Sequence, residues 1–451
     1  MAPRWWPWQP WRPARTPPRS AGRYGLPSAA AGPDLIITRL QWMVLQLSRK
    51  LWVRATAFSL LAVATALVAV LVERYIPEDI PAKIGADAVD NLLNILAASM
   101  LSVTIFSLST LVAALASATS NVTPRATRLL TENSTAQNAL ATFLGTFLYS
   151  LVGIIALQMG LYGGTGRVVL YVVTLLVIVV IVATLLKWID HVSKLGRVGQ
   201  TTDRVEEAAA SAMRDRHRHP YLGGRPLTAA EAMPDDAVAV FTDAYGYVAH
   251  VDMEALSSQC EARDCEVYVA ALPGRYVEPS QPLAWFSTAC DDDTLDAVRE
   301  AFSVEKVRSF DQDPRFGICV LSEIAARALS PAVNDPGTAI DVLGRLLRLL
   351  ALWTAPLVRE APEHPRVHVP PVLATELFDD AFTAIARDGA GLVEVAVRLQ
   401  KTLRTLSRME TPGYADAARR HAGEALQRAR DAMTLEADRE RVASIANTLP
   451  G

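Results

Sequence analysis

Four long apolar stretches constrain the fold of this chain more than any other feature. They cover about residues 54–72, 92–118, 139–160 and 168–187, and the interior of each is free of charged residues. A helix needs roughly 20 consecutive apolar residues to cross the hydrocarbon core of a bilayer. We therefore expect an α-helical membrane protein with about four transmembrane helices in the lipid bilayer, followed by an α+β cytoplasmic domain.

Charged residues around these stretches predict the orientation. Basic residues precede the first stretch and follow the second and the fourth, whereas the segment after the first is rich in Asp and Glu. Because basic residues concentrate in cytoplasmic loops, we expect a cell (inner or plasma) membrane protein whose N-terminus and C-terminal domain are both cytoplasmic. The basic residues concerned are Arg39, Arg49, Lys50, Arg54, Arg125, Arg128, Lys187, Lys194 and Arg197.

The second stretch differs from the others because small and polar residues follow one side of it. Steps of three and four residues, which keep to one face of a helix, connect Asn91, Asn94, Ala98, Ser102, Ile105, Ser109, Ala113, Ala116 and Ser120. One interpretation is close packing of this face within one subunit. The other is a pore-lining helix in a ring of subunits, where small and hydroxyl side chains leave room for water.

The pore interpretation names specific residues. Phe106 would form an apolar constriction, and Arg125 and Arg128 would lie at the cytoplasmic mouth, where positive charge attracts anions. Coupled transport through a proton relay has little support, because no span contains an ionisable residue in its interior. This interpretation predicts a homo-oligomer with ions as permeant species. The pore-lining candidates are Asn91, Asn94, Ala98, Ser102, Phe106, Ser109 and Ala113.

Composition divides the chain into five segments. Residues 1–50 carry many Trp, Pro and Arg residues without a long apolar run, which indicates a disordered segment. This segment is either an anchor at the inner leaflet or a tail that begins at a mistaken start codon. The predicted segments after it are a four-helix transmembrane domain (51–190), a helical linker (191–234), a small β-domain (235–290) and a helical cytoplasmic domain (291–451).

The linker first continues the pattern of the fourth stretch and then changes character. Apolar residues from Trp188 to Val205 recur at helical spacing, so we expect the fourth helix to run on into the cytoplasm. The segment from Arg214 to Arg225 is rich in His, Arg, Pro and Gly, which predicts a break. His217 and His219 suggest a metal site, but a solvated junction explains them better.

Short segments of β-rich sequence follow the linker. Strands are predicted at Val238–Phe241, Tyr245–His250, Val267–Ala271 and Leu283–Phe286. With glycine turns at Gly246 and Gly274, the region is similar over about fifty residues to the barrel-sandwich fold of biotinyl and lipoyl domains and of membrane-fusion adaptors. No lysine occupies a hairpin tip, where biotin or lipoate would attach, so the likeness implies a structural or docking module.

Two later helices have recognisable starts. Asp313-Pro314 precedes the apolar run 316–329, and Asn334-Asp335-Pro336 precedes the run 340–352. Asp at an N-cap accepts hydrogen bonds from free backbone N–H groups, and Pro suits the first helical position. An alternative is that Asp311, Asp313, Asn334 and Asp335 gather into a catalytic or metal site.

The chain ends in two long amphipathic segments, about 372–408 and 413–447, joined at Thr411-Pro412-Gly413. They predict a helical hairpin that packs its apolar stripes on the two preceding helices.

Several classes of function lack their usual signals. The net charge of −3 gives no general attraction to nucleic acid. The four cysteines lack the spacing of a zinc site, and Asp291, Asp292 and Asp293 fit a charged helix start better than a calcium loop. No Walker loop, GxGxxG turn, GxSxG elbow or HExxH pair is present. We expect a protein that is not an enzyme and that needs no metal or cofactor.

Four segments resemble a bacterial family of predicted membrane proteins, DUF2254. They are Thr123-Pro124-Arg125, Gly145-Thr146-Phe147-Leu148-Tyr149, the run from Phe310 to Gly317 and the run from Ala328 to Ala339. The resemblance covers most of the chain from about residue 50. It implies the topology derived above and no activity, ligand or catalytic residue. Two functions stay open: an oligomeric, channel-like pore, or a membrane-anchored scaffold or sensor that acts through its cytoplasmic domain without transport.

Overall fold

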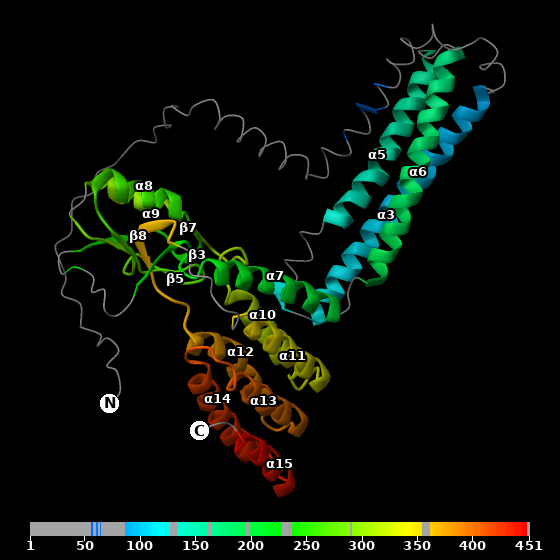
Figure 1. Cartoon of the computed structure of the whole chain (residues 1–451). Coiled ribbons are helices and arrows are strands. Elements are labelled where there is room, and N and C mark those ends of the chain that lie inside the picture. The colour runs from blue at the N-terminus through cyan, green and yellow to red at the C-terminus, as the bar shows by residue number, and fades with distance from the viewer. Residues whose placement is uncertain are drawn as a thin grey trace.

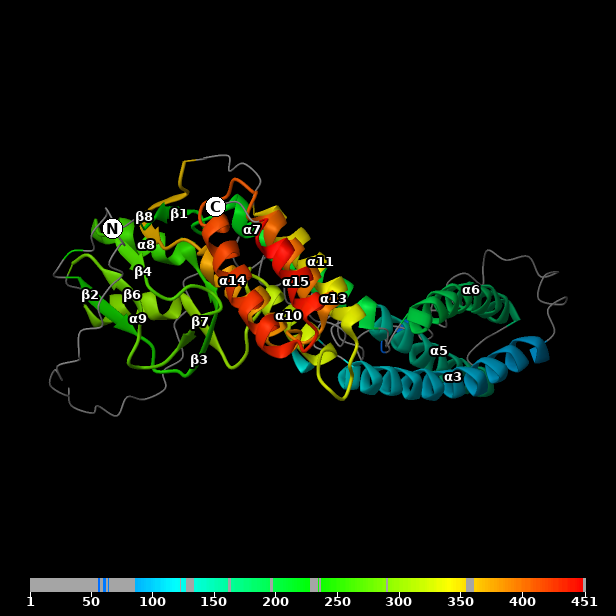
Figure 2. The same ribbon diagram turned by 90° about the horizontal axis from the view of Figure 1, so that it is seen from below.

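The computed structural model describes residues 86–121, 123–126, 134–160, 164–194, 198–227, 237–288, 291–353 and 361–448, together with positions 56, 60, 61, 64 and 234. Three long helices project from one end of an elongated molecule, and the sheets and shorter helices form the other end (Figures 1 and 2). The expected N-terminal segment, 1–50, and most of the first apolar stretch lie outside the described residues.

The projecting bundle consists of α3 (Ala86–Asn121), α5 (Ser134–Gln158) and α6 (Gly164–Lys194). Each helix is long and apolar enough to cross a membrane over Ala88–Ser117, Thr135–Gln158 and Gly166–Ser193 respectively. Three of the four expected spans are therefore confirmed as helices of sufficient length and apolarity. α3 packs along α5, and α6 contacts both of them.

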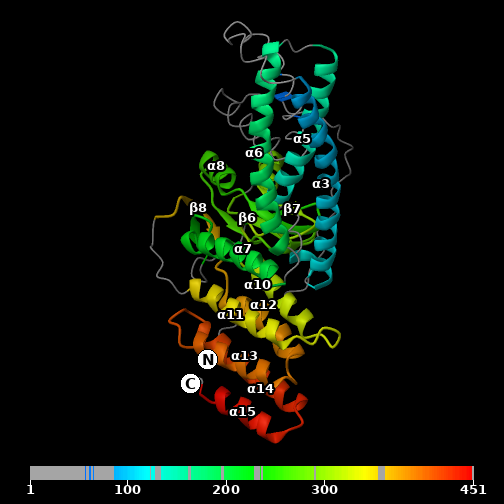
Figure 3. The same cartoon turned by 90° about the vertical axis from the view of Figure 1, so that its right-hand side faces the viewer.

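The linker forms a separate helix, α7 (Val198–Arg218), which lies at an angle to α6 at the base of the bundle (Figures 1 and 3). It packs against α10 (Phe316–Ala328) and α11 (Pro336–Leu352). Val205, Ala209 and Met213 on α7 are buried in this contact. The helix ends at Arg218, inside the stretch from Arg214 to Arg225 where a break is predicted.

In the part of the chain that the structure describes, the strands form two sheets. A five-stranded mixed sheet has the order β1-β8-β4-β6-β2, and a three-stranded antiparallel sheet has the order β5-β3-β7. Strand β8 pairs in parallel with both β1 and β4. The strands are β1 (Gly224–Pro226), β2 (Val238–Phe241), β3 (Gly246–Val251), β4 (Val267–Val269), β5 (Tyr276–Val277), β6 (Pro282–Phe286), β7 (Phe302–Glu305) and β8 (His364–Val369).

The four strands expected from the sequence are present as β2, β3, β4 and β6, but the sheets also contain elements that the pattern did not indicate. Helix α8 (Met253–Arg263) lies between β3 and β4, and α9 (Asp292–Glu300) precedes β7. β1, β7 and β8 come from outside the expected range 235–290. The likeness to barrel-sandwich domains stays a prediction.

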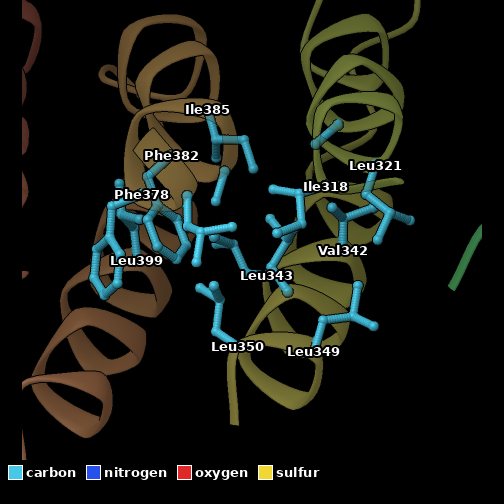
Figure 4. Close-up of a cluster of buried hydrophobic side chains, with 14 of the residues drawn as sticks. Ile318, Leu321, Val342, Leu343, Leu349, Leu350, Phe378, Phe382, Ile385 and Leu399 are labelled. Carbon is cyan, nitrogen blue, oxygen red and sulfur yellow. The ribbon is translucent and has the colours of Figure 1, made fainter. Parts of the chain in front are cut away.

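Among the described residues the helical part is a stack of six helices. Besides α10 and α11 it contains α12 (Ala374–Asp388), α13 (Val393–Leu406), α14 (Tyr414–Ala432) and α15 (Glu436–Ala446). Helices α10 to α14 share one large apolar core with α7, while α15 packs on a smaller one with α13 and α14. Side chains from α10 and α11 face those from α12 and α13, as Figure 4 shows for Ile318, Leu343, Phe382 and Leu399. Burial of this apolar surface supplies the main driving force for folding here.

The two long terminal segments are each broken into two helices. The first ends at Asp388 and resumes at Val393, where two glycines, Gly389 and Gly391, weaken the helix. The second ends at Ala432 and resumes at Glu436. The predicted hairpin of two helices is therefore a chain of four, with the turn near Gly413 as expected.

Candidate functional site

The polar row on α3 lies on the exposed side of that helix. The packed side carries Val89, Leu93, Leu96, Met100 and Ser107, all of which are buried. At 100° per residue, these side chains lie opposite the row that runs through Ser102 and Ser109. The exposed row members are Asn91, Asn94, Ala98, Ser102, Ile105, Ser109, Ala113 and Ala116, while the side chain of Ser120 lies outside the described residues. Among the described residues, packing within the subunit thus uses the other side of α3.

Large apolar side chains lie within this row and beside it, so α3 presents a mixed surface. Phe106 is 71% exposed and Ile105 is 59% exposed. The polar groups also bond within the helix: the Asn94 amide donates to the Asp90 carbonyl at 2.9 Å, and the Ser102 hydroxyl donates to the Ala98 carbonyl at 3.1 Å. These bonds lower the cost of placing the groups in lipid. The row is compatible with water, lipid or another helix.

Arg125 joins the membrane bundle to the helical stack. Its guanidinium forms an ion pair with Glu323 on α10. Next to it, Ala126 is buried in the core that α7 and α10 share, and the Thr123 hydroxyl accepts a hydrogen bond from the Ala126 N–H at 3.4 Å. The Thr123-Pro124-Arg125 segment therefore fixes the end of the bundle against α10. Arg128, the second mouth candidate, lies outside the described residues.

A cluster of charged side chains fixes α7 against α11. Arg345, only 10% exposed at its side chain, pairs with Asp203 at 2.6 Å and with Glu206 and Asp341 at 2.7 Å. Burial acts to raise the pKa of Glu206, but hydrogen bonds from Arg348 and Arg345 outweigh it and hold that pKa below its ordinary value. α7 follows α6 directly in the sequence, so this cluster links a membrane helix to the helical stack.

The residues of the two Asp-Pro motifs lie at opposite ends of α10. The carboxylate of Asp313 accepts hydrogen bonds from the backbone N–H groups of Arg315 (3.0 Å) and Phe316 (3.2 Å). Asp335 accepts from the Thr338 N–H at 3.1 Å and precedes Pro336 at the start of α11. A helix of 13 residues separates the two motifs by about 20 Å. They do not form one catalytic or metal cluster.

Neighbouring members of these motifs have other roles. Pro314 borders a cavity where the sheets, α7 and the helical stack meet. Asn334 has a φ of 49°, a left-handed conformation that Asn tolerates better than most residues. Among the described residues, no group of three His, Cys, Asp or Glu side chains has the geometry to hold a metal ion. Asp291 caps α9 by accepting from the Thr294 N–H at 3.0 Å.

Reasoning from the sequence missed Arg216 and Arg345. The segment around Arg216 was predicted to be a solvated junction, yet Arg216 is only 3% exposed. The signal that existed was position: Val205, Ala209 and Arg216 share one side of a helix at steps of four and seven. The charge of Arg216 and the basic residues beside it concealed that periodicity.

These features define a class: a multi-pass membrane protein whose helical bundle is fixed, through α7 and Arg125, to a domain of mixed sheets and stacked helices. Residues 48–405 match the family described as "Predicted membrane protein (DUF2254)". The chain belongs to this family.

The curated relatives are mycobacterial proteins. The uncharacterized protein Rv1290c of Mycobacterium tuberculosis and the uncharacterized protein Mb1321c of Mycobacterium bovis are each 27% identical to this chain over 256 residues, which is 54% of this chain. The match covers 47% of each relative, so the chain spans about half the length of these proteins. No solved structure matches the chain at a significant level.

Proposed function

We propose that the protein is a homo-oligomer of the inner membrane in which the α3 helices of several subunits line a water-filled path for ions. The observation that carries this proposal is the exposure of the small and polar row, from Asn91 to Ala116, on the side of α3 opposite its packed side. A symmetric ring would bring the same row from each copy to one axis. Hydroxyl and small side chains there leave room for water.

The charge pattern of the spans favours passive conduction. Within the described membrane helices, residues 91–117, 135–158 and 168–186 contain no Asp, Glu, Lys, Arg or His. Coupled carriers and pumps normally place ionisable groups at such depths. Phe106 would narrow the path, and Arg125 would lie near its cytoplasmic mouth, although its pairing with Glu323 offsets part of its charge. This reduces the expected bias toward anions.

A membrane-anchored sensor or scaffold is the second candidate, and the Arg345 cluster favours it. Arg345 and Arg348 of α11 hold Glu206 of α7, and Arg125 holds Glu323 of α10. Such contacts would transmit a change in the soluble part to the membrane helices without any transport. In that case the exposed row of α3 would face lipid or a partner helix.

Mass measurement in detergent and conductance in planar bilayers test the pore. A ring of subunits that conducts is expected, and Ser102→Trp and Ser109→Trp should block the current because the indole fills the path. Leu108→Trp is the matched control, because Leu108 is also exposed on α3, at 51%, but lies away from the row. A monomer, or a ring without current at any voltage or tension, would favour the sensor or scaffold.

A further inference from the structure

A cavity of about 490 Å³ lies where the sheets, α7 and the helical stack meet. Its wall includes four arginines: Arg216 of α7, Arg275 of the turn before β5, and Arg308 and Arg315 around the start of α10. The volume falls in the range of small-molecule sites, roughly 300–1,000 Å³. Glu376 also lines it, so arginines outnumber carboxylates in the wall.

Two of the four guanidinium groups already have carboxylate partners. Arg308 binds Asp313 through both Nε and Nη2 at 2.7 Å, and Arg315 binds Asp380 at 2.7 Å and Glu376 at 2.9 Å. The approach of Asp313 depends on Gly274, since a Cβ there would lie 2.2 Å from the Asp313 Oδ2. These pairs fix the arrangement of the wall.

Among the described residues, Arg216 and Arg275 have no such carboxylate partners. Within the described part of the chain, the Nε and Nη1 groups of Arg216 have no hydrogen-bond partner, and its Nη2 donates only to the Gln312 carbonyl at 3.3 Å. Arg275 donates to the Ala270 carbonyl at 3.0 Å. Arg216 is buried, with only 3% of its surface exposed. A buried cation with unsatisfied donors is costly unless something pairs with it.

Burial also affects the titration of Arg216. Desolvation lowers its pKa to about 10, against a smaller opposing influence of Asp313. The guanidinium therefore stays positively charged at neutral pH. Arg216 also borders a second cavity of about 370 Å³, but that one contains Asp215, Asp252, Asp311 and Glu363, which would repel an anion. The first cavity is the one suited to negative charge.

The remaining wall is apolar and largely proline. Leu272 and Pro273 come from the turn after β4, and Pro370, Pro371 and Val372 come from the segment that joins β8 to α12 (Figure 1). We propose that this cavity binds a small organic oxyanion, whose phosphate or carboxylate group pairs with Arg216 while its apolar part lies against these residues. Guanidinium groups bind both kinds of oxyanion through paired hydrogen bonds.

The first test is calorimetry of the full chain in detergent with three probes: phenyl phosphate, benzoate and inorganic phosphate. Comparison of phenyl phosphate with benzoate identifies the preferred oxyanion, and the better of the two should bind more tightly than inorganic phosphate because of the apolar wall. Arg216→Gln should lower the affinity for that probe about tenfold or more. Arg218→Gln is the matched control, because Arg218 is 68% exposed on the same helix and should change nothing.

A second variant keeps the test valid if Arg216→Gln does not fold. Leu373 lines the cavity, is 42% exposed, and occupies the N-cap of α12 without a side-chain cap. Leu373→Asp supplies that cap and adds negative charge, so it should fold well and bind the probe several-fold more weakly. Leu373→Asn supplies the cap without the charge. No binding of any probe at about 10 mM, or equal binding by the Asp and Asn variants, would overturn the proposal.

Discussion

Asp313 and Asp335 show how one residue type stabilises helix starts in two different surroundings. Asp313 is 2% exposed and binds both Arg308 and the first N–H groups of α10. Asp335 is exposed and binds the Thr338 N–H and hydroxyl. The hydrogen bonds from Thr338 lower the pKa of Asp335. The first carboxylate therefore belongs to a buried charge cluster, and the second serves its helix alone.

Replacing the Asp335 carboxylate tests this assignment. Asp335→Ala should lower the free energy of unfolding by about 1 kcal/mol, because the N–H of Thr338 loses its acceptor. Asp335→Asn keeps an acceptor and should cost much less. Denaturant unfolding of the full chain in detergent measures both. Normal stability of Asp335→Ala combined with loss of a measured activity would instead make Asp335 a functional carboxylate.

His421 should make stability depend on pH. It is 1% exposed, and its Nε2 lies 3.0 Å from the Asp379 carboxylate. Burial, and then the charge of Arg420, lower the pKa of His421. The unfolded chain therefore binds this proton more readily, so stability is full above about pH 6.5 and is lost as the pH falls below it. We expect a lower Tm at about pH 5.5 than at about pH 7.5.

A leucine variant isolates this effect. His421→Leu removes the titrating group but keeps contact with Phe378 and Phe382, whose rings lie 6.2 Å from that of His421. Its Tm should change less between the two pH values. Burial acts to raise the pKa of Asp379, but the hydrogen bond and charge of Arg420 outweigh it and hold that pKa below its ordinary value, so the contribution of Asp379 to stability is lost only at still lower pH. An equal change of Tm with pH in the wild-type protein and in His421→Leu would mean that another group titrates.

The contact between helices α7 and α10 depends on a glycine. A Cβ at Gly317 of α10 would lie 2.3 Å from the Ala209 Cβ of α7. The two helices approach this closely only because Gly317 has no side chain. α7 is thus held by close packing at Gly317 as well as by the ion pairs of Arg345.

Two glycine substitutions test the contact. Gly317→Ala should lower the free energy of unfolding by about 1–3 kcal/mol, because α7 and α10 must move apart. Gly423→Ala in α14 meets no atom within 4 Å and should raise stability by about 0.5–1 kcal/mol through a better helix propensity. Thermal unfolding compares the two. Equal changes in stability for the two variants would contradict a steric clash between a Cβ at Gly317 and Ala209.

Elements with regular apolar patterns could be predicted from the sequence, and others could not. The spans and the strands β2, β3, β4 and β6 follow from stretch length and from alternation. Helix α8 escaped because its buried side includes Ser257 and Cys260 beside Met253 and Leu256, which hides the helical period. Strand β8 has the sequence HPRVHV, and only its parallel partners β1 and β4 make it a strand.

The candidate sites also divide into those that follow from a local sequence pattern and those that depend on tertiary contacts. The row on α3 is visible as small residues at helical spacing, because spacing is a local property. The arginine-lined cavity combines Arg216, Gly274, Arg308 and Leu373, which are far apart in the sequence. Only the tertiary structure brings them together. The run from Phe310 to Gly317 resembles the family in its sequence, but the contacts of Gln312 with α7 and with β3 depend on the tertiary structure.

At the scale of the whole molecule, the orientation in the membrane is a testable expectation. In a background with native cysteines replaced by Ser, a thiol introduced as Arg408→Cys should react with an impermeant reagent only after the cells are permeabilised. Met159 is 70% exposed in the turn after α5, and Met159→Cys should react in intact cells. The reason is the concentration of basic residues on the side of the helical stack. The reverse pattern would contradict a cytoplasmic soluble part.

The parallel pairing of β8 has a consequence for how the chain is made. Gly224 of β1 pairs with His364, and Val267 of β4 pairs with Val367, while α10 and α11 are built from the residues between. During synthesis the membrane helices emerge first. Strand β4 can pair with β6 once both have emerged, but β1 and the edge of β4 that faces β8 stay unpaired until residue 369 has left the ribosome. Sheets and helical stack are thus interlaced along the chain. No single position in the chain divides the sheets from the helical stack. The soluble part should therefore fold late and in one cooperative step.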